Sequence, residues 1–236
     1  MDEIVKDMGI ILIASLAPVV FLMLYIYGKD KCQKEPFGQL IKALIGGVLA
    51  GIADVILLSV LGFAEVKTFS SDLAQAFYQS FCQAAMPEEF CKLLFLYWFI
   101  WKIPSFDEYY DGIEYAAFVG LGFAGLENIL YVFQGGLGVA VSRAIFAVPA
   151  HFFFAIIMGY FFAFAKFRPW KKKEYLLLAY ICPVIMHGIY DFILMYNNII
   201  QTTNTGTAAI LNLAFFAFFI FIWRLANKRI KTTSGK

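Results

Sequence analysis

Long apolar runs dominate the hydrophobic pattern of this chain, and short polar segments separate them. A helix needs about 20 mostly apolar residues to cross the hydrocarbon core of a bilayer. We expect membrane-spanning helices at Gly9–Tyr27, Ile41–Ala64, Leu73–Trp101, Gly112–Phe133, Val141–Ala165, Tyr175–Tyr196 and Thr207–Leu225. The pattern predicts an all-α membrane protein: a bundle of about seven transmembrane helices in a single integral membrane domain, residues 1–236.

The composition supports this class of protein. Hydrophobic residues make up 61% of the 236 residues and charged residues only 15%, whereas about a quarter of an ordinary soluble domain is charged. The formal net charge is +2, and the basic residues lie between apolar runs rather than along one stripe. We therefore expect the lipid bilayer as a partner, a multi-pass location in the cell membrane, and no nucleic acid partner.

Basic residues gather in three of the connections. They follow the first helix (Lys29, Lys31, Lys34, Lys42), the fifth (Lys166, Arg168, Lys171, Lys172, Lys173) and the seventh (Arg224, Lys228, Arg229, Lys231). Short loops rich in lysine and arginine stay on the cytoplasmic side of a membrane. The N-terminus is therefore predicted to lie outside and the C-terminus inside.

Two predicted helices carry small residues at helical spacing. These are Gly47 and Gly51 in the second helix, and Ala116, Gly120 and Ala124 in the fourth. Small residues let helix backbones approach closely in lipid. We therefore expect a packed bundle.

The third predicted helix carries ionisable residues at membrane depth, where a charge costs about 2.5–3.5 kcal/mol on insertion scales unless it is partnered. Glu88 and Lys92 lie one turn apart and can pair. Glu89 points about 100° away around the helix. Because Pro87 lacks a backbone donor, we expect a kink beside the pair.

Three more predicted helices carry polar residues at a similar depth. These are Glu127 and Asn128 in the fourth helix, Arg143 and His151 in the fifth, and His187 and Asp191 in the sixth. Both histidines of the chain lie roughly 15 Å below the expected outer ends of their helices, at 1.5 Å per residue. Four helices thus direct polar side chains at one layer, which indicates an aqueous site inside the bundle. Asp54, in the second helix, could pair with Lys92 or Arg143, but a structural role is favoured.

These residues resemble the motifs of the PrsW family of intramembrane glutamic-type proteases, which is related to the CAAX prenyl endopeptidase and bacteriocin-processing superfamily. The matching pieces are EExxK (Glu88, Glu89, Lys92), the glycine-rich segment from Gly120 to Glu127 and Asn128, His151 after Pro149, and HGIYD from His187 to Asp191. The resemblance covers roughly residues 75–195, the third to sixth helices. It implies that these four helices form the catalytic core.

The chain departs from the better-known members of that superfamily, which have EExxxR, FxxxH and HxxxN or HxxxD. Lys92 stands one position nearer to the glutamates, and Phe123 is followed four residues later by Glu127 where a histidine would stand. His151 is the candidate to take the part of that histidine.

The resemblance implies peptide hydrolysis within the membrane. PrsW-type proteins are linked to the first, site-1 cut of a single-span anti-sigma factor in a stress response. With the predicted topology, the cut falls near the extracytoplasmic side. We therefore expect a single-span membrane protein as substrate, with an anti-sigma factor as the candidate.

Amide hydrolysis needs a base to activate water, and a carboxylate in a low-dielectric bundle can hold and exchange a proton. We assign Glu88 as the base, with Glu89 as the positional alternative. Lys92 would anchor both glutamates. His151 would orient the water or share its proton.

Other residues complete the predicted site. His187 and Asn128 can donate hydrogen bonds to the developing oxyanion, and Asp191 can hold His187 in one tautomer. Glu127 is a further supporting residue.

The sequence contains no GxSxG, HExxH or paired aspartate motif, so serine, zinc-metalloprotease and aspartyl types lack their usual signatures. We favour a site without a cofactor. A zinc-dependent membrane hydrolase or a metal transporter stays open, since His151, His187 and Glu88 could act as zinc ligands. A non-enzymatic transporter or receptor also stays open, because polar residues can line a pathway or stabilise packing.

The topology can be tested by cysteine labelling at two positions on opposite sides. A membrane-impermeant reagent added outside should label Gly136→Cys and should not label Lys172→Cys. The reverse pattern would overturn the predicted orientation and the extracytoplasmic position of the site.

Overall fold

The computed structural model describes residues 2–30, 33–62 and 69–233, and short connections separate the helices in that part of the chain. In chain order the elements are α1 (Asp2–Lys29), α2 (Phe37–Val60), α3 (Asp72–Phe77), the π-helical η1 (Tyr78–Ala85), α4 (Met86–Ile100), α5 (Tyr109–Ser142), the π-helical η2 (Arg143–Ala147), α6 (Val148–Phe167), the 3₁₀ turn η3 (Pro169–Lys171), α7 (Lys172–Ile200) and α8 (Thr205–Thr233). No strand occurs among the described residues, so the all-α prediction is confirmed.

Five runs of the described residues are long and apolar enough to cross a membrane. They are Gly9–Lys29, Phe37–Val60, Tyr109–Phe167, Pro169–Ile200 and Thr205–Thr233. The third run contains both α5 and α6. The helical segment of α3, η1 and α4 coincides with the predicted third span but is not among the five. The chain is a multi-pass membrane protein, while the number of seven helices and the orientation of the termini stay predictions. Lys31 and the predicted end of the second span at Ala64 lie outside the described residues.

α5 and α6 form an antiparallel hairpin. Gly112 packs against Ala163, and Gly120 packs against Ala155. The chain reverses at Gly136, whose φ of 72° lies in the left-handed region that glycine adopts at little cost. The sequence predicted a loop at this position, whereas helical geometry continues on both sides of the single break.

Gly138 offers a better position than Gly136 for a cysteine probe of this connection. The space around a Cβ at Gly138 is open, and its backbone is not left-handed. A cysteine there would report the same side of the membrane without strain at the reversal.

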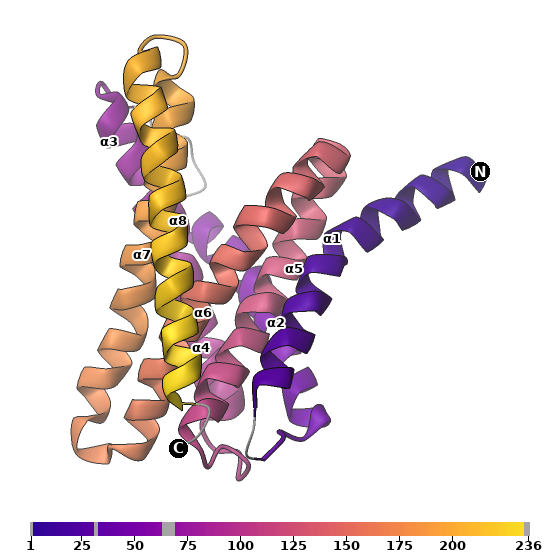
Figure 1. Cartoon of the computed structure of the whole chain (residues 1–236), viewed down its shortest axis with the longest axis vertical. Helices are drawn as coiled ribbons and strands as arrows, with labels where there is room; N and C mark the ends of the chain where they lie inside the picture. Colours follow the sequence, from indigo (N-terminus) through magenta and orange to yellow (C-terminus); the bar gives the residue numbers. More distant parts are fainter. Residues whose placement is uncertain (1, 31–32, 63–68, 234–236) are drawn as a thin grey trace.

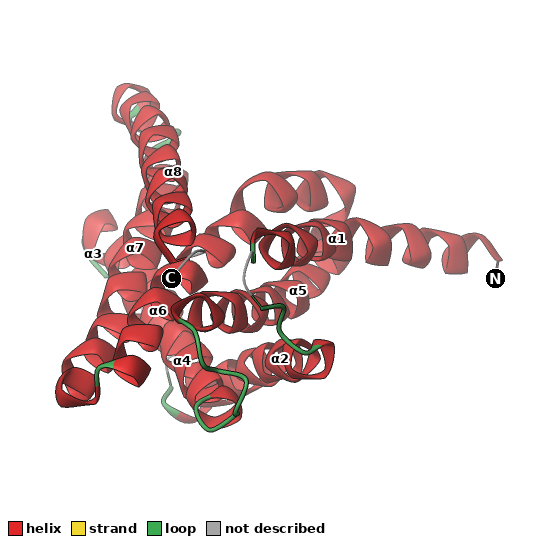
Figure 2. Cartoon of the chain, turned by 60° about the horizontal axis from the view of Figure 1, so that its bottom comes forward, coloured by secondary structure: helices red, strands yellow, loops and turns green. Residues whose placement is uncertain are grey.

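The α5–α6 hairpin lies in the middle of the molecule. Figure 2 shows α1, α2, α4, α7 and α8 around it. α1 and α8 expose large apolar side chains such as Ile13 and Leu213, which are 71% and 72% exposed. Helices with apolar outer surfaces of this kind are typical of membrane spans.

The basic connections lie at one end of the bundle. The end of α1, the α6–α7 connection and the end of α8 lie together at the bottom of Figure 1, as the positive-inside pattern requires. At this end Tyr115 of α5 donates to the buried carboxylate of Glu35, and Tyr110 donates to the carbonyl oxygen of Ile26 at 2.7 Å. Burial raises the pKa of Glu35 above its ordinary value. These contacts fasten the α1–α2 connection to α5.

Glycines set the distance between α2 and α5. A Cβ at Gly47 would collide with the carbonyl oxygen of Val119, and a Cβ at Gly122 would collide with that of Leu44. Gly51, one turn beyond Gly47, also faces side chains of α5. The predicted close approach through small residues is therefore confirmed at this interface.

We expect Gly47→Ala to lower the thermal stability of the purified protein, because the added methyl group would overlap the backbone oxygen of Val119. Overpacking typically costs about 1–3 kcal/mol. Gly38→Ala is the control on the same helix: apart from its chain neighbours and the nearby backbone of its own helix, no described atom lies within 4 Å of a Cβ there, and alanine favours the helix. Thermal unfolding in detergent measures both variants. Equal melting temperatures would contradict the tight α2–α5 contact.

Candidate active site

The two helices that carry Glu88 and His151 each begin directly after a π-helical segment. η1 leads into α4, which has Pro87 in its first turn, and η2 leads into α6, which has Pro149 in its first turn. Proline has no N–H to donate, and π-helical turns are frequent at functional sites. A kink was predicted beside Pro87; the structure has a π-helical segment directly before this turn.

The structure brings the four predicted catalytic residues together. Glu88 and Glu89 come from α4, His151 from α6 and His187 from α7, and one ligand atom of each lies within 4.8 Å of the others. We call these four residues the glutamate–histidine cluster. The convergence at one depth that the sequence predicted is therefore present in the structure.

The ammonium group of Lys92 contacts three members of this cluster. Nζ donates to Oε2 of Glu88 at 3.2 Å and to Oε1 of Glu89 at 2.8 Å, and lies 3.1 Å from Nδ1 of His151. Lys92 is buried, and Nζ lies 4.1 Å from the centre of the Phe123 ring. Since an ammonium group has no lone pair, Nδ1 of His151 is the acceptor in this contact.

A neutral His151 therefore carries its proton on Nε2. That nitrogen lies 2.8 Å from Oε2 of Glu127, which Arg143 also contacts at 2.9 Å. The two contacts fix the orientation of the ring, with Nδ1 turned toward the cluster. Glu127 was predicted as a supporting residue, whereas no catalytic or supporting role was predicted for Arg143. The sequence does not indicate toward which partner a single arginine side chain in an apolar helix points.

Carboxylates hold His187 from both sides. Nδ1 lies 2.9 Å from Oε1 of Glu89, and Nε2 lies 3.1 Å from Oδ2 of Asp191. The ring stacks on Phe154, with 4.9 Å between the ring centres. Because a carboxylate only accepts, each contact requires a proton. His187 is therefore an imidazolium or shares its protons with Glu89 and Asp191.

Asn128 is turned toward a different set of partners. Its Nδ2 donates to the carbonyl oxygen of Ser15 on α1 at 2.6 Å, and its Oδ1 accepts from Nε of Arg143 at 2.9 Å. The amide thus positions Arg143, and the structure does not bring it into the glutamate–histidine cluster. Asp54 is buried on α2 beside Glu88 and forms no ion pair within the described ranges.

Two cavities meet at Glu88. One of about 450 Å³ lies mainly between α2, η1 and α5, and another of about 470 Å³ lies mainly between α5, α6, α7 and α8. The residues that line both are Ala84, Glu88, Glu127, Tyr131 and Met195. The Glu88 side chain is 12% exposed, whereas that of Glu89 is fully buried. Of the two glutamates, Glu88 is the one within reach of water and a bound peptide.

The glutamate–histidine cluster also has the donor atoms of a zinc site. Structural and catalytic zinc ions bind imidazole nitrogens and carboxylate oxygens, and the cluster offers two of each within 4.8 Å. Oε2 of Glu89 is buried and has no hydrogen-bond partner in the described part of the chain. The residues therefore fit a metal, although Lys92 contacts three of the four and would compete for them.

Comparisons with known proteins agree with these motifs. Residues 35–223 match the model of a family described as "PrsW family intramembrane metalloprotease". "Protease PrsW" of Oceanobacillus iheyensis is 38% identical over 221 residues, 94% of each chain. "Protease PrsW" of Geobacillus kaustophilus is 37% identical over 182 residues, 77% of this chain and 78% of the relative. "Protease PrsW" of Bacillus subtilis is 35% identical over 185 residues, 78% of this chain and 82% of the relative.

No solved structure is significantly similar to the chain. The family model covers most of the sequence, and the relatives align over more than three quarters of their own length. The chain therefore belongs to the PrsW family of intramembrane metalloproteases and is a membrane protease.

Proposed function

We propose that this membrane protease cuts a single-span membrane protein near the extracytoplasmic face, with Glu88 as the base that activates water. The observation that carries the proposal is the position of Glu88, whose carboxylate borders both cavities while Lys92 holds one of its oxygens. An extended peptide that runs through both cavities would place a carbonyl group beside Glu88. Glu89, which is fully buried against Lys92 and His187, positions those two residues.

The site residues can carry the protons of peptide hydrolysis. Glu88 takes a proton from water as the water oxygen bonds to the carbonyl carbon, and it returns that proton to the amide nitrogen as the C–N bond breaks. Nδ1 of His151 lies on the same side, 4.0 Å from Oε2 of Glu88, and because its lone pair accepts from Lys92, His151 positions the ammonium group beside the water. The products are a carboxyl group and an amine, and Glu88 ends as it began.

Positive charge beside the substrate stabilises the oxyanion. His187 lines the second cavity and holds protons between Glu89 and Asp191. Together with Lys92, it supplies preorganised charge for the carbonyl oxygen. Asp191 orients the His187 ring.

A divalent metal is a second candidate component, since the family is described as metalloproteases and the donor atoms fit. Glu88, Glu89, His151 and His187 would hold it. When bound, it would supply Lewis-acid polarisation of the scissile carbonyl and of water. We favour the site without metal, because Lys92 already places a positive charge against three of these donors.

The depth of the cluster supports a cut near the extracytoplasmic face. Glu88, His151 and His187 lie 12 to 16 residues from the ends of α4, α6 and α7 at the basic end of the bundle. That separation is roughly 18–24 Å at 1.5 Å per residue, in a hydrocarbon core about 30 Å thick. With the basic end in the cytoplasm, the cluster lies nearer the other face.

The PrsW motifs support an anti-sigma factor as the substrate and the first cut as the reaction. The family assignment favours this enzyme over a non-enzymatic transporter or receptor and over a metal transporter.

Glu88→Gln and His187→Ala should each lower cleavage by at least about 100-fold, the contribution typical of a positioned acid or base, while the protein stays folded. Cleavage is measured by co-expression with doubly tagged single-span membrane proteins, and folding by thermal unfolding in detergent. Glu174→Gln is the control, since that carboxylate is exposed on α7. Normal cleavage by a folded Glu88→Gln variant would exclude Glu88 as the base.

Chelation should leave the cleavage rate of the wild type nearly unchanged. Lys92→Gln removes the competing ammonium group, so this variant should retain more zinc than the wild type after dialysis. Metal content by mass spectrometry is the measurement, with Lys171→Gln, a change at an exposed lysine, as the control. One tightly bound zinc per wild-type chain, whose removal abolishes cleavage and whose return restores it, would contradict the metal-free site.

A further inference from the structure

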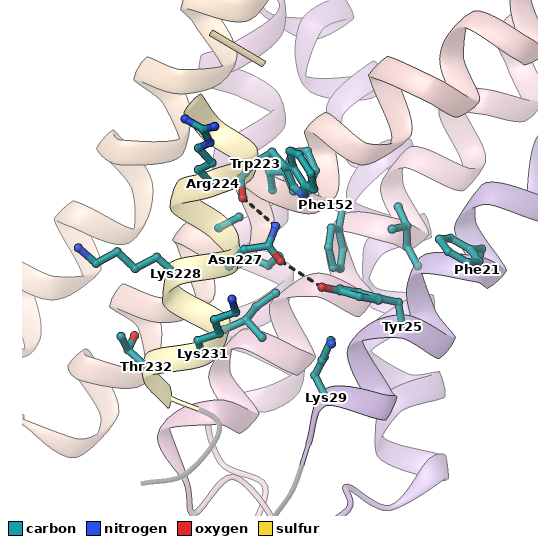
Figure 3. Close-up of a pocket in the computed structure, with 15 residues that line it drawn as sticks. Phe21, Tyr25, Lys29, Phe152, Trp223, Arg224, Asn227, Lys228, Lys231 and Thr232 are labelled. Carbon is teal, nitrogen blue, oxygen red and sulfur yellow. Dashed lines mark hydrogen bonds between the residues drawn. The ribbon is translucent and has the colours of Figure 1, made fainter. Parts of the chain in front are cut away.

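A cavity of about 920 Å³ lies between α1, α6 and α8, on a different face of α6 from the glutamate–histidine cluster. Figure 3 shows the 15 residues that line it. Its apolar lining comes chiefly from Phe21, Leu22, Phe152, Phe153 and Ile156. These residues belong to α1 and α6, so the cavity has an apolar wall formed by two helices.

Basic side chains line the same cavity at the end of the bundle that carries the lysine-rich connections. They are Lys29, Arg224, Lys228 and Lys231. All four are exposed, and none forms an ion pair with another described residue. No aspartate or glutamate is among the lining residues. Basic pockets between transmembrane helices on the cytoplasmic side are typical binding places for anionic headgroups.

Two of these cations approach one space from different helices. In Figure 3, Lys29 of α1 and Lys231 of α8 lie on opposite sides of the cavity below the Tyr25–Asn227 pair, and both side chains extend toward that pair. Tyr25 donates to Oδ1 of Asn227 at 3.0 Å, which links α1 to α8 across the cavity. Like charges that share a space repel each other, and an anion between them removes the repulsion. The arrangement thus favours a negatively charged ligand at this point.

We propose that this cavity binds an anionic glycerophospholipid, with its phosphodiester between Lys29 and Lys231 and its acyl chains along the apolar wall of α1 and α6. Trp223 and Tyr25 also line the cavity, and these residue types gather at membrane interfaces. The polar and apolar parts of the cavity therefore match the two parts of a phospholipid. Inorganic phosphate would use only the polar part. A second copy of the chain would bring its own basic end against these unpaired cations.

The proposal is tested by lipid binding to wild type and to Lys29→Gln/Lys231→Gln. Phosphatidylglycerol added to the detergent-purified protein should raise the melting temperature of the wild type more than phosphatidylcholine does, and native mass spectrometry should show the bound lipid. The double variant should bind phosphatidylglycerol at least about tenfold more weakly, since each lysine near a headgroup contributes appreciably. Lys29→Arg/Lys231→Arg, which keeps both charges, should bind as the wild type does and confirms that the positions tolerate substitution.

Lys171→Gln/Lys173→Gln is the matched control, because it removes the same charge from the same end of the bundle at residues outside the cavity. This pair should keep the affinity for phosphatidylglycerol. If both double glutamine variants lost the same affinity for phosphatidylglycerol, the effect would come from general surface charge, and the proposal would be overturned. Equal stabilisation by phosphatidylcholine or by inorganic phosphate would also overturn it, as would a dimer that forms through this face without bound lipid.

Discussion

The buried ammonium group of Lys92 is the interaction on which the candidate active site depends. A charge in the interior of a bilayer is costly unless it is paired, and α4 brings two carboxylates there within one turn. Lys92 neutralises part of that charge through Glu88 and Glu89, and it also fixes His151 as an acceptor at Nδ1. Removing one partner of a buried ion pair typically costs about 3–5 kcal/mol. The glutamates, the lysine and the histidines therefore form one unit, in which each member depends on the others.

This unit requires helices that approach closely, and the packing of α5 against α6 provides that approach. A Cβ at Gly120 would lie 2.5 Å from Cβ of Ala155 and 3.3 Å from the carbonyl oxygen of His151. The small residue on α5 thus sets how near the backbone of α6 lies at His151. Because the two helices lie this close, Glu127, two turns further along α5, can contact Nε2 of His151. Helix packing and the tautomer of the histidine are therefore linked through the same pair of helices.

Much of this arrangement could be predicted from the sequence, because helix length and depth in the membrane can be counted along the chain. Apolar length gives the helices, and counting residues from helix ends gives the depth of His151 and His187. The rotation of each helix about its axis has no such signal, so the partners of Asn128 and the pairing of Arg143 with Glu127 were not predicted. The π-helical segments before Pro87 and Pro149 make this rotation harder still to predict. They change the angular spacing between successive residues, on which the assignment of a residue to a helix face depends.

α6 lines both the cavity beside the glutamate–histidine cluster and the cavity proposed to bind a lipid. His151 faces the glutamate–histidine cluster, while Phe152, the next residue and about 100° further around the helix, lines the cavity between α1 and α8. A lipid in this cavity would contact the turn of α6 that holds His151. Catalytic groups must be held within about 0.5 Å of their working positions, so a small shift of that turn would change the geometry around Lys92 and Glu88. The same helix therefore borders both the proposed lipid site and the glutamate–histidine cluster.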